Sequence, residues 1–190
     1  MSTQTIKIMN MCCDRCIMVV KQVLAEFGIK HKKVGLGYAV IYEKPAISRS
    51  ALEKALKKPV FEIIRTKEEE ICEKMKIAIH KIFFDSSLNE LTAFNLKSYM
   101  ESQTGIPYKK LTAIFSKETQ TTIEKYFIRH RIEKAKAIIE SRNYSFSEIA
   151  FRLGYNSLSH LSRQFKEIEG CSMHDYKQKG KRARKPIDRL

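Results

Sequence analysis

Hydrophobic residues in the first third of the chain follow two different periods. Residues 5–9 alternate polar and apolar side chains, which predicts a β-strand. Strand-like patterns return at residues 30–34 and 38–42, and the glycines between them predict a hairpin. Between the first two strands, one helical face collects the apolar side chains of Ile17, Val20, Val23, Leu24 and Phe27, and Gly28 is suited to end that helix.

A second helix and a last strand complete this region. Ser48 is a suitable N-cap for a helix through residue 57, which Pro59 would stop, and residues 60–64 have a strand pattern. The predicted order, βαββαβ, is that of the split ferredoxin-like unit. Residues 1–66 are therefore predicted to form an α+β domain of the ferredoxin-like fold.

From residue 67 onward the hydrophobic period is helical. Residues 67–87 are predicted to form one amphipathic connecting helix, and residues 88–177 an all-α domain. The helices expected in that domain cover residues 88–103, 108–117, 123–141, 147–153, 157–169 and 173–178. The basic residues 178–190 contain Gly and Pro and are expected to be a disordered tail, which either keeps the protein soluble or contacts phosphates nonspecifically.

Charge and cysteine usage narrow the range of functions. The 190 residues include 36 Lys and Arg against 21 Asp and Glu, and the net charge of +15 favours a polyanionic partner such as nucleic acid. No run approaches the ~20 apolar residues that a membrane-spanning helix needs. The first residues also lack a secretory signal pattern. We therefore expect a cytoplasmic protein whose five cysteines stay reduced, which favours metal binding or redox chemistry over disulfides.

Residues 144–165 carry the pattern of a helix-turn-helix motif. Ser147 would cap a short helix, Gly154 would end it, and a second helix would begin after Asn156. This arrangement lets the second helix project into the DNA major groove. The residues predicted to hold the two helices together are Ile149, Ala150, Leu153, Leu161 and Phe165.

The run SFSEIAFRLGYNSLSHLSRQFKEIEGCSMHDYK resembles the second helix-turn-helix of the AraC/XylS family, with its Ile-Ala, Gly-Tyr, Ser-Arg-x-Phe-Lys and closing Gly. Arg131, Ala135 and residues 138–139 resemble the linker helix of that family. Residues 107–116 are similar to its first recognition helix, although the helix before them carries the bulky Tyr99 and Met100. The resemblance covers roughly residues 88–177 and implies a double helix-turn-helix that binds double-stranded DNA.

The family pattern places DNA-reading roles on ten residues. Those in the second recognition helix are Asn156, Ser157, Ser159, His160, Arg163 and Gln164, and those in the first are Tyr108, Lys109, Lys110 and Thr112. Arg can contact guanine, and Asn or Gln can contact adenine, through paired hydrogen bonds. Contact with phosphate or solvent alone is the alternative for each of them.

The segment Asn10-Met11-Cys12-Cys13-Asp14-Arg15-Cys16 lies between the first predicted strand and helix. Two thiols in a C-x-x-C pattern can converge on one soft ion there, and the helix N-terminus and Arg15 favour the thiolate forms. This segment and the βαββαβ order resemble the heavy-metal-associated domain and its motif Gly-Met-Thr-Cys-x-x-Cys. Met11, Cys13 and Cys16 match, whereas Asn10 and Cys12 depart. The resemblance implies Cu(I) as the ion at Cys13 and Cys16, with Met11 as a buried prop.

Cys12 offers a third sulfur, which would extend the choice of metal to Zn(II). Because neighbouring side chains in an extended loop point to opposite sides, we expect Cys12 to contribute less than the other two cysteines. Phe61 either shields the metal loop, as an aromatic residue does in copper-transporting relatives, or belongs to the core. The remaining candidates are predicted to be packing or surface residues: Cys72, Cys171, His80, His130 and His174.

These features together predict a sequence-specific DNA-binding transcription regulator that responds to a thiophilic metal ion. Its predicted partners are double-stranded DNA and the ion, and self-association as a homodimer stays open. A thiol-redox-responsive regulator and a metal carrier or buffer tethered to nucleic acid are the alternatives. An enzyme is not expected, because no nucleophile with its base and no phosphate-binding glycine loop can be placed in the sequence.

Overall fold

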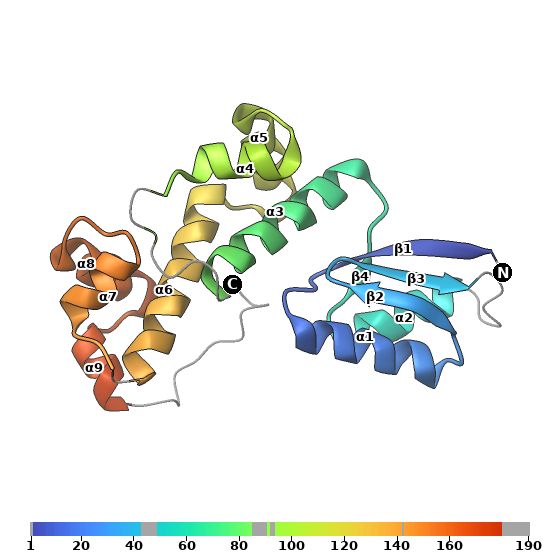
Figure 1. The fold of residues 1–190 in the computed structure, drawn as a ribbon, viewed down its shortest axis with the longest axis horizontal. Helices are drawn as coiled ribbons and strands as arrows, with labels where there is room; N and C mark the ends of the chain where they lie inside the picture. Colours follow the sequence, from blue (N-terminus) through green and yellow to red (C-terminus); the bar gives the residue numbers. More distant parts are fainter. Residues whose placement is uncertain (1, 43–48, 85–90, 92–93, 142, 180–190) are drawn as a thin grey trace. The chain divides into compact units, whose positions relative to one another are not determined.

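A computed structural model describes residues 2–42, 49–84, 91, 94–141 and 143–179 (Figure 1). The chain divides into two compact units, residues 1–78 and residues 79–190. The boundary falls inside helix α3 (Lys67–Phe84). Residues 67–78 of this helix therefore belong to the first unit, and residues 79–84 belong to the second.

The first unit is built on a four-stranded antiparallel sheet (Figure 1). Its elements follow in the order β1 (Thr3–Met9), α1 (Asp14–Glu26), β2 (His31–Gly35), β3 (Tyr38–Tyr42), α2 (Arg49–Lys57) and β4 (Glu62–Ile63). The strands lie in the order β2-β3-β1-β4, and β1 pairs antiparallel with both β3 and β4. The cysteine-bearing segment therefore follows a strand that is held on both edges.

Helices α1 and α2 lie on one side of the sheet, and the hydrophobic core fills the space between them and the strands (Figure 1). The core side chains from the two helices are Val20, Val23, Leu24, Leu52, Ala55 and Leu56, and the first three are among those that the hydrophobic period predicts. Ile17 and Phe27 pack at the edge of this cluster and are only partly buried. Burial of such apolar surface, at about 25 cal/mol per Å², is the main force that holds the unit together.

The predicted order of elements is confirmed in the first unit, but some boundaries are wrong. Helix α1 begins at Asp14, so that Cys16, expected in the loop, lies in the first helical turn. Strand β4 is shorter than predicted because Val60 has a left-handed backbone (φ 72°), which a strand excludes. The expected N-cap, Ser48, lies outside the described residues.

The second unit is all-α in the residues that the structure describes (Figure 1). After the end of α3 it contains α4 (Leu96–Thr104), α5 (Tyr108–Thr119), α6 (Ile123–Ser141), α7 (Phe146–Arg152), α8 (Leu158–Glu169) and α9 (Met173–Lys179). The bounds predicted for α6 are confirmed. None of the described helices is both long enough and apolar enough to cross a membrane.

Several helix boundaries in the second unit differ from prediction. The helix expected from residue 88 begins at Leu96, because Asn95 is its N-cap and accepts a hydrogen bond from the Ser98 N–H at 3.0 Å. Helix α7 is capped by Ser145 and not by Ser147. Helix α9 continues through residue 179, so the first two residues of the predicted tail are helical, while residues 180–190 lie outside the described part of the chain.

A charged side chain lies in the core of the second unit. The Lys136 ammonium group on α6 is fully buried, donates a hydrogen bond to Glu133 at 2.7 Å and lies 3.1 Å from the Glu169 carboxylate. Two carboxylates at hydrogen-bonding distance compensate the loss of water around the buried ammonium. This pairing ties the middle of α6 to the last residue of α8.

The histidines predicted to be packing or surface residues are found in such places. His80 and His130 are buried, with ring centroids 6.4 Å apart, and burial lowers the pKa of His130 to about 4. The His130 ring is therefore neutral at physiological pH and packs beside Tyr126 and Phe83. His174 is exposed on α9.

Gly154 forms the turn between α7 and α8 and has a left-handed backbone, with φ of 72°. A Cβ atom at this position would lie 2.4 Å from the carbonyl oxygen of Leu91. Gly170, which ends α8, has nearly the same φ, 73°, but no atom lies within 4 Å of its Cβ position. The two glycines therefore differ in crowding and not in backbone conformation.

We expect Gly154→Ala to lower the free energy of unfolding by at least about 3 kcal/mol, and Gly170→Ala by about 1–2 kcal/mol. Both variants place an L side chain in the left-handed region, but only Gly154→Ala drives a methyl group into neighbouring backbone. Urea unfolding of the two variants measures the difference. Equal losses would show that the backbone at residue 91 does not constrain this turn.

Candidate functional site

The second helix-turn-helix motif is built from α7, the turn at Gly154, and α8. At the start of α7, the Ser145 hydroxyl accepts from the Glu148 N–H, and the Glu148 carboxylate accepts from the Ser145 N–H at 2.7 Å. At the start of α8, the Ser157 hydroxyl accepts a hydrogen bond from the His160 N–H at 3.2 Å. These caps satisfy backbone donors at both helix starts and fix where each helix begins.

Tyr155, in the turn, organises the start of α8. Its ring is buried, and its hydroxyl donates a hydrogen bond to the Gln164 side-chain oxygen at 2.8 Å. The Arg131 guanidinium from α6 stacks over this ring, 4.9 Å from its centroid, and burial raises the pKa of the Tyr155 phenol. The His160 ring meets Tyr155 edge-on at 5.2 Å. Two predicted DNA contacts, His160 and Gln164, are therefore held by a tyrosine of the turn.

The other predicted residues of α8 lie on its exposed side. Ser159 and Arg163 are exposed and are spaced four residues apart, so they share one helix face. Asn156 is exposed just before the helix, and Ser157 combines exposure with its capping role. Lys166 is exposed on the same helix, and the prediction does not include it, although its spacing of three residues from Arg163 is the signal that finds it.

In the first motif, α5 offers a less even surface. Lys109 and Lys110 are exposed, whereas Tyr108 is half-buried and its hydroxyl donates to the Glu124 carboxylate at 2.7 Å. Burial, together with this carboxylate, raises the pKa of the Tyr108 phenol. The Thr112 hydroxyl donates to the Lys109 carbonyl oxygen at 2.9 Å. Bulky Met100 on α4 is fully buried, so the core accommodates the departure from the family pattern.

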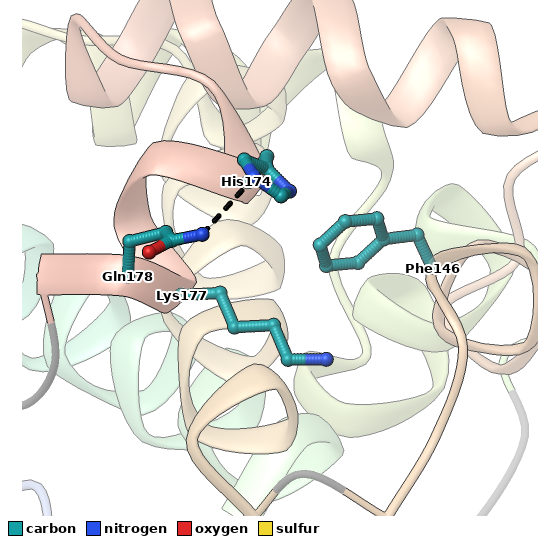
Figure 2. A pocket seen from close by; sticks show the side chains of 4 residues that line it. All are labelled: Phe146, His174, Lys177 and Gln178. Carbon is teal, nitrogen blue, oxygen red and sulfur yellow. Dashed lines mark hydrogen bonds between the residues drawn. The ribbon is translucent and has the colours of Figure 1, made fainter.

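A hollow of about 360 Å³ lies between α7 and α9 and is lined by Phe146, His174, Lys177 and Gln178. Figure 2 shows that the side chains of His174 and Lys177 extend from α9 toward the Phe146 ring. The Lys177 ammonium lies 5.6 Å from the centroid of that ring, and His174 and Gln178 are hydrogen-bonded. None of the predicted DNA-reading residues lines this hollow.

Three cysteines converge where β1 leads into α1. The Sγ atoms of Cys12, Cys13 and Cys16 all lie within 4.8 Å of one another, and the first two each lie 3.8 Å from that of Cys16. Cys13 is the N-cap of α1, and Cys16 lies in its first turn. The expectation that Cys12 and Cys13 point to opposite sides is wrong, because both of their sulfurs lie 3.8 Å from that of Cys16.

The thiols of Cys12 and Cys16 change each other's acidity. A hydrogen bond from the Cys12 thiol and others from the backbone at Cys12 and Cys13 lower the pKa of Cys16 to about 5. The same interaction with Cys16, together with burial, raises the pKa of Cys12. These interactions favour the thiolate form at Cys16 over that at Cys12. A thiolate is the form of cysteine that binds soft metal ions.

Two side chains of helix α3 form hydrogen bonds with the loop that carries the cysteines. The Glu73 carboxylate accepts a hydrogen bond from the Met11 N–H at 3.2 Å, and Lys76 donates to the Asn10 side-chain oxygen at 3.5 Å. Met11 is fully buried, as the resemblance implies. No sequence pattern singles out Glu73, because it is one of several acidic residues in the first half of an amphipathic helix.

The remaining candidates are not members of the thiol cluster. Phe61 is buried in the core of the first unit, which supports its core role. Cys72 is fully buried on α3, as predicted for a small apolar residue. Cys171 is half-buried after α8. Among the described residues, Cys12, Cys13 and Cys16 form the one group of three or more His, Cys, Asp or Glu side chains with ligand-like spacing.

Comparison with known proteins bears on the second unit. Residues 100–179 match the family model described as a helix-turn-helix domain. A 67-residue stretch is 33% identical to YdiP, an uncharacterized HTH-type transcriptional regulator of Escherichia coli (strain K12), covering 35% of this chain and 22% of that protein. The chain thus spans about a fifth of the length of this relative.

Two solved structures resemble this chain. One is the C-terminal domain of AraT, a response regulator from Geobacillus stearothermophilus, with 20% identity, a TM-score of 0.50, and coverage of 60% of this chain and 88% of that one. The other is the DNA-binding domain of AdpA in complex with a target DNA, with 21% identity, a TM-score of 0.46, and coverage of 57% and 90%.

The family match confirms the prediction of a helix-turn-helix domain in the C-terminal part of the chain, over residues 100–179. The match spans both predicted recognition helices, α5 and α8. Residues 1–99 lie outside it, so their assignment to the heavy-metal-associated domain stays a prediction.

Proposed function

We propose that this protein is a DNA-binding transcription regulator of the AraC type that responds to a thiophilic metal ion held by Cys12, Cys13 and Cys16. The observation that carries the proposal is the convergence of three sulfurs in a chain whose other half is a helix-turn-helix domain. Cu(I) is the favoured ion and Zn(II) the second choice, because both bind thiolates well.

The helix-turn-helix supports the DNA half of the proposal. Exposed Ser159 and Arg163 share a face of α8, and exposed Lys109 and Lys110 lie at the start of α5. A net charge of +15 attracts the DNA backbone, and Arg on a recognition helix can read guanine in the major groove. We therefore assign base reading chiefly to Arg163, with Asn156 and Ser159 beside it.

The spacing of the sulfurs supports the metal half. Thiolates bound to one ion at about 2.3 Å, in trigonal or tetrahedral geometry, lie about 4 Å apart. The two Sγ–Sγ separations of 3.8 Å to Cys16 are close to this value, so little movement is needed to bind one ion. The three residues would supply soft sulfur ligands. On binding, the ion would displace the thiol protons, and its positive charge would balance the negative charge of the thiolates.

The architecture of the first unit supports its kinship with heavy-metal-associated domains. The element order βαββαβ and the strand order β2-β3-β1-β4 agree with a ferredoxin-like arrangement. Asn10 stands where the motif has Gly and has a φ of 67°, a conformation that Asn tolerates better than most residues. The backbone thus keeps a glycine-like turn despite the departure in sequence.

Arg163→Ala is expected to reduce the discrimination between a selected DNA site and random duplex by about 1–3 kcal/mol, because a base-edge contact is lost. The site is a duplex that the wild-type protein selects from a random pool. Fluorescence anisotropy at fixed salt measures both affinities. Arg163→Lys is the matched control for charge, and it should lose the discrimination while keeping affinity for random duplex. Equal weakening on both DNAs would reassign Arg163 to phosphate contact.

Replacing Cys13 or Cys16 by Ser is expected to abolish tight Cu(I) binding, because a hydroxyl is a hard and poorly ionised ligand. Since Cys12 lies as close to Cys16 as Cys13 does, we now expect Cys12→Ser to weaken binding by at least about tenfold as well. Titration of anaerobic protein against a competing chelator measures these affinities, and Cys171→Ser, in the other unit, is the control.

The same titrations separate the alternatives. Unchanged Cu(I) and Zn(II) binding in all three variants would contradict the metal site and favour the redox-responsive regulator, whose thiols would instead protect one another from alkylation after mild oxidation. Intact metal binding without any preferred DNA sequence would favour a metal carrier or buffer tethered to nucleic acid.

A further inference from the structure

Resting on the function proposed above, we propose that Glu73 is the positioning residue of the thiol site, and that it links the occupancy of that site to helix α3. Its carboxylate accepts the hydrogen bond of the Met11 N–H, at 3.2 Å, from behind the loop. Met11 is the residue before Cys12, so this bond fixes the backbone from which two of the three sulfurs project.

Glu73 is placed at a cost in stability. Its exposed fraction is only 3%, and burial raises the pKa of its carboxyl group. Its second oxygen, Oε2, has no hydrogen-bond donor in the described residues, and the nearest ammonium, that of Lys76, lies 4.0 Å away. A buried carboxyl group with so few partners destabilises a fold relative to an apolar side chain of similar size.

The contacts of α3 are directed at the loop. Lys76, one turn after Glu73, donates to the Asn10 side chain at 3.5 Å, and Asn10 in turn donates to the carbonyl oxygen of Val60 at 3.0 Å. We call the contacts of Glu73 with Met11 and of Lys76 with Asn10 the α3 latch. The α3 latch contacts Asn10 and Met11, the two residues immediately before Cys12. Asn10 is the residue with the left-handed backbone.

The α3 latch connects the thiol site to helix α3, which continues into the second unit. Helix α3 is continuous from residue 67 to residue 84, and its residues 79–84 belong to the helix-turn-helix unit. Even a small adjustment of the Cys12 backbone on ion binding would reach Met11, and the Glu73 hydrogen bond would pass it to α3. The proposed regulatory link is thus the hydrogen bond between the Met11 N–H and Glu73. It depends on the position of the acceptor oxygen more than on the charge of the carboxylate.

Three substitutions at Glu73 separate geometry from charge. Glu73→Gln keeps the reach and the acceptor oxygen but removes the charge. Glu73→Asp keeps the charge but is one methylene too short, and Glu73→Leu has similar size and no acceptor. Glu70→Leu is the matched control, because Glu70 lies one turn earlier on α3 and pairs with Lys7 and Lys74, outside the loop.

The full-length variants are titrated with Cu(I) against a competing chelator. Glu73→Leu and Glu73→Asp should bind Cu(I) about 10- to 100-fold more weakly than wild type, as is typical when a residue behind metal ligands is lost. Glu73→Gln and Glu70→Leu should stay within about threefold of wild type. In the metal-free protein, hydrogen exchange of the Met11 amide should accelerate in the Leu and Asp variants only.

The affinity of each variant for the selected duplex, with and without Cu(I), tests the link to α3. The ratio of the two affinities should fall toward one in Glu73→Leu and Glu73→Asp and persist in Glu73→Gln. Wild-type behaviour of the Leu and Asp variants would overturn the proposal, and so would a Gln variant as defective as the other two. The proposal is supported if Cu(I) changes the DNA affinity of Glu73→Gln but not that of Glu73→Leu or Glu73→Asp, and if Cys13→Ser also shows no change. If Cys13→Ser instead binds Cu(I) normally, the metal site itself fails.

Discussion

The left-handed turn at Asn10 is the constraint on which the thiol site depends. It redirects the chain as β1 ends, so that Cys12 and Cys13 approach the first turn of α1, where Cys16 lies. The turn is held from two sides, by the Asn10 bond to Val60 and by the contact with Lys76. Three sulfurs thereby share one small volume, and the pKa of Cys16 is lowered toward the thiolate form that soft ions bind.

A comparable constraint shapes the DNA-binding half. The recognition helix α8 begins where it does because Gly154 turns in the left-handed region against the backbone of Leu91 and because Ser157 caps the helix. Tyr155 then connects the turn to α6, through the Arg131 guanidinium, and to α8, through the Gln164 side chain. These interactions leave Ser159 and Arg163 on the exposed face, where a base edge can be contacted. The buried Lys136 fixes the other end of α8.

Much of this organisation is readable from the sequence, and the failures have local causes. The two hydrophobic periods predict the βαββαβ order and the helices of the second half, because core positions repeat with the geometry of each element. Predicted helix starts are wrong where two nearby residues could each serve as the N-cap, as when Ser145 and not Ser147 caps α7. Glu73 is missed because its role arises from contact with a loop 62 residues away in sequence. The approach of Cys12 to Cys16 is missed because it depends on one backbone angle at Asn10.

The proposed regulation requires ion capture and DNA binding to be coupled within one chain. Coupling between two ligands is reciprocal, and in regulators it typically changes affinity by about 5- to 150-fold. The most direct measurement is therefore the affinity of the reduced wild-type protein for its selected duplex with and without one equivalent of Cu(I), paired with its Cu(I) affinity with and without that duplex. Both affinities should change by the same factor, and Cys13→Ser should abolish the change. Affinities that are identical with and without the ion would contradict it.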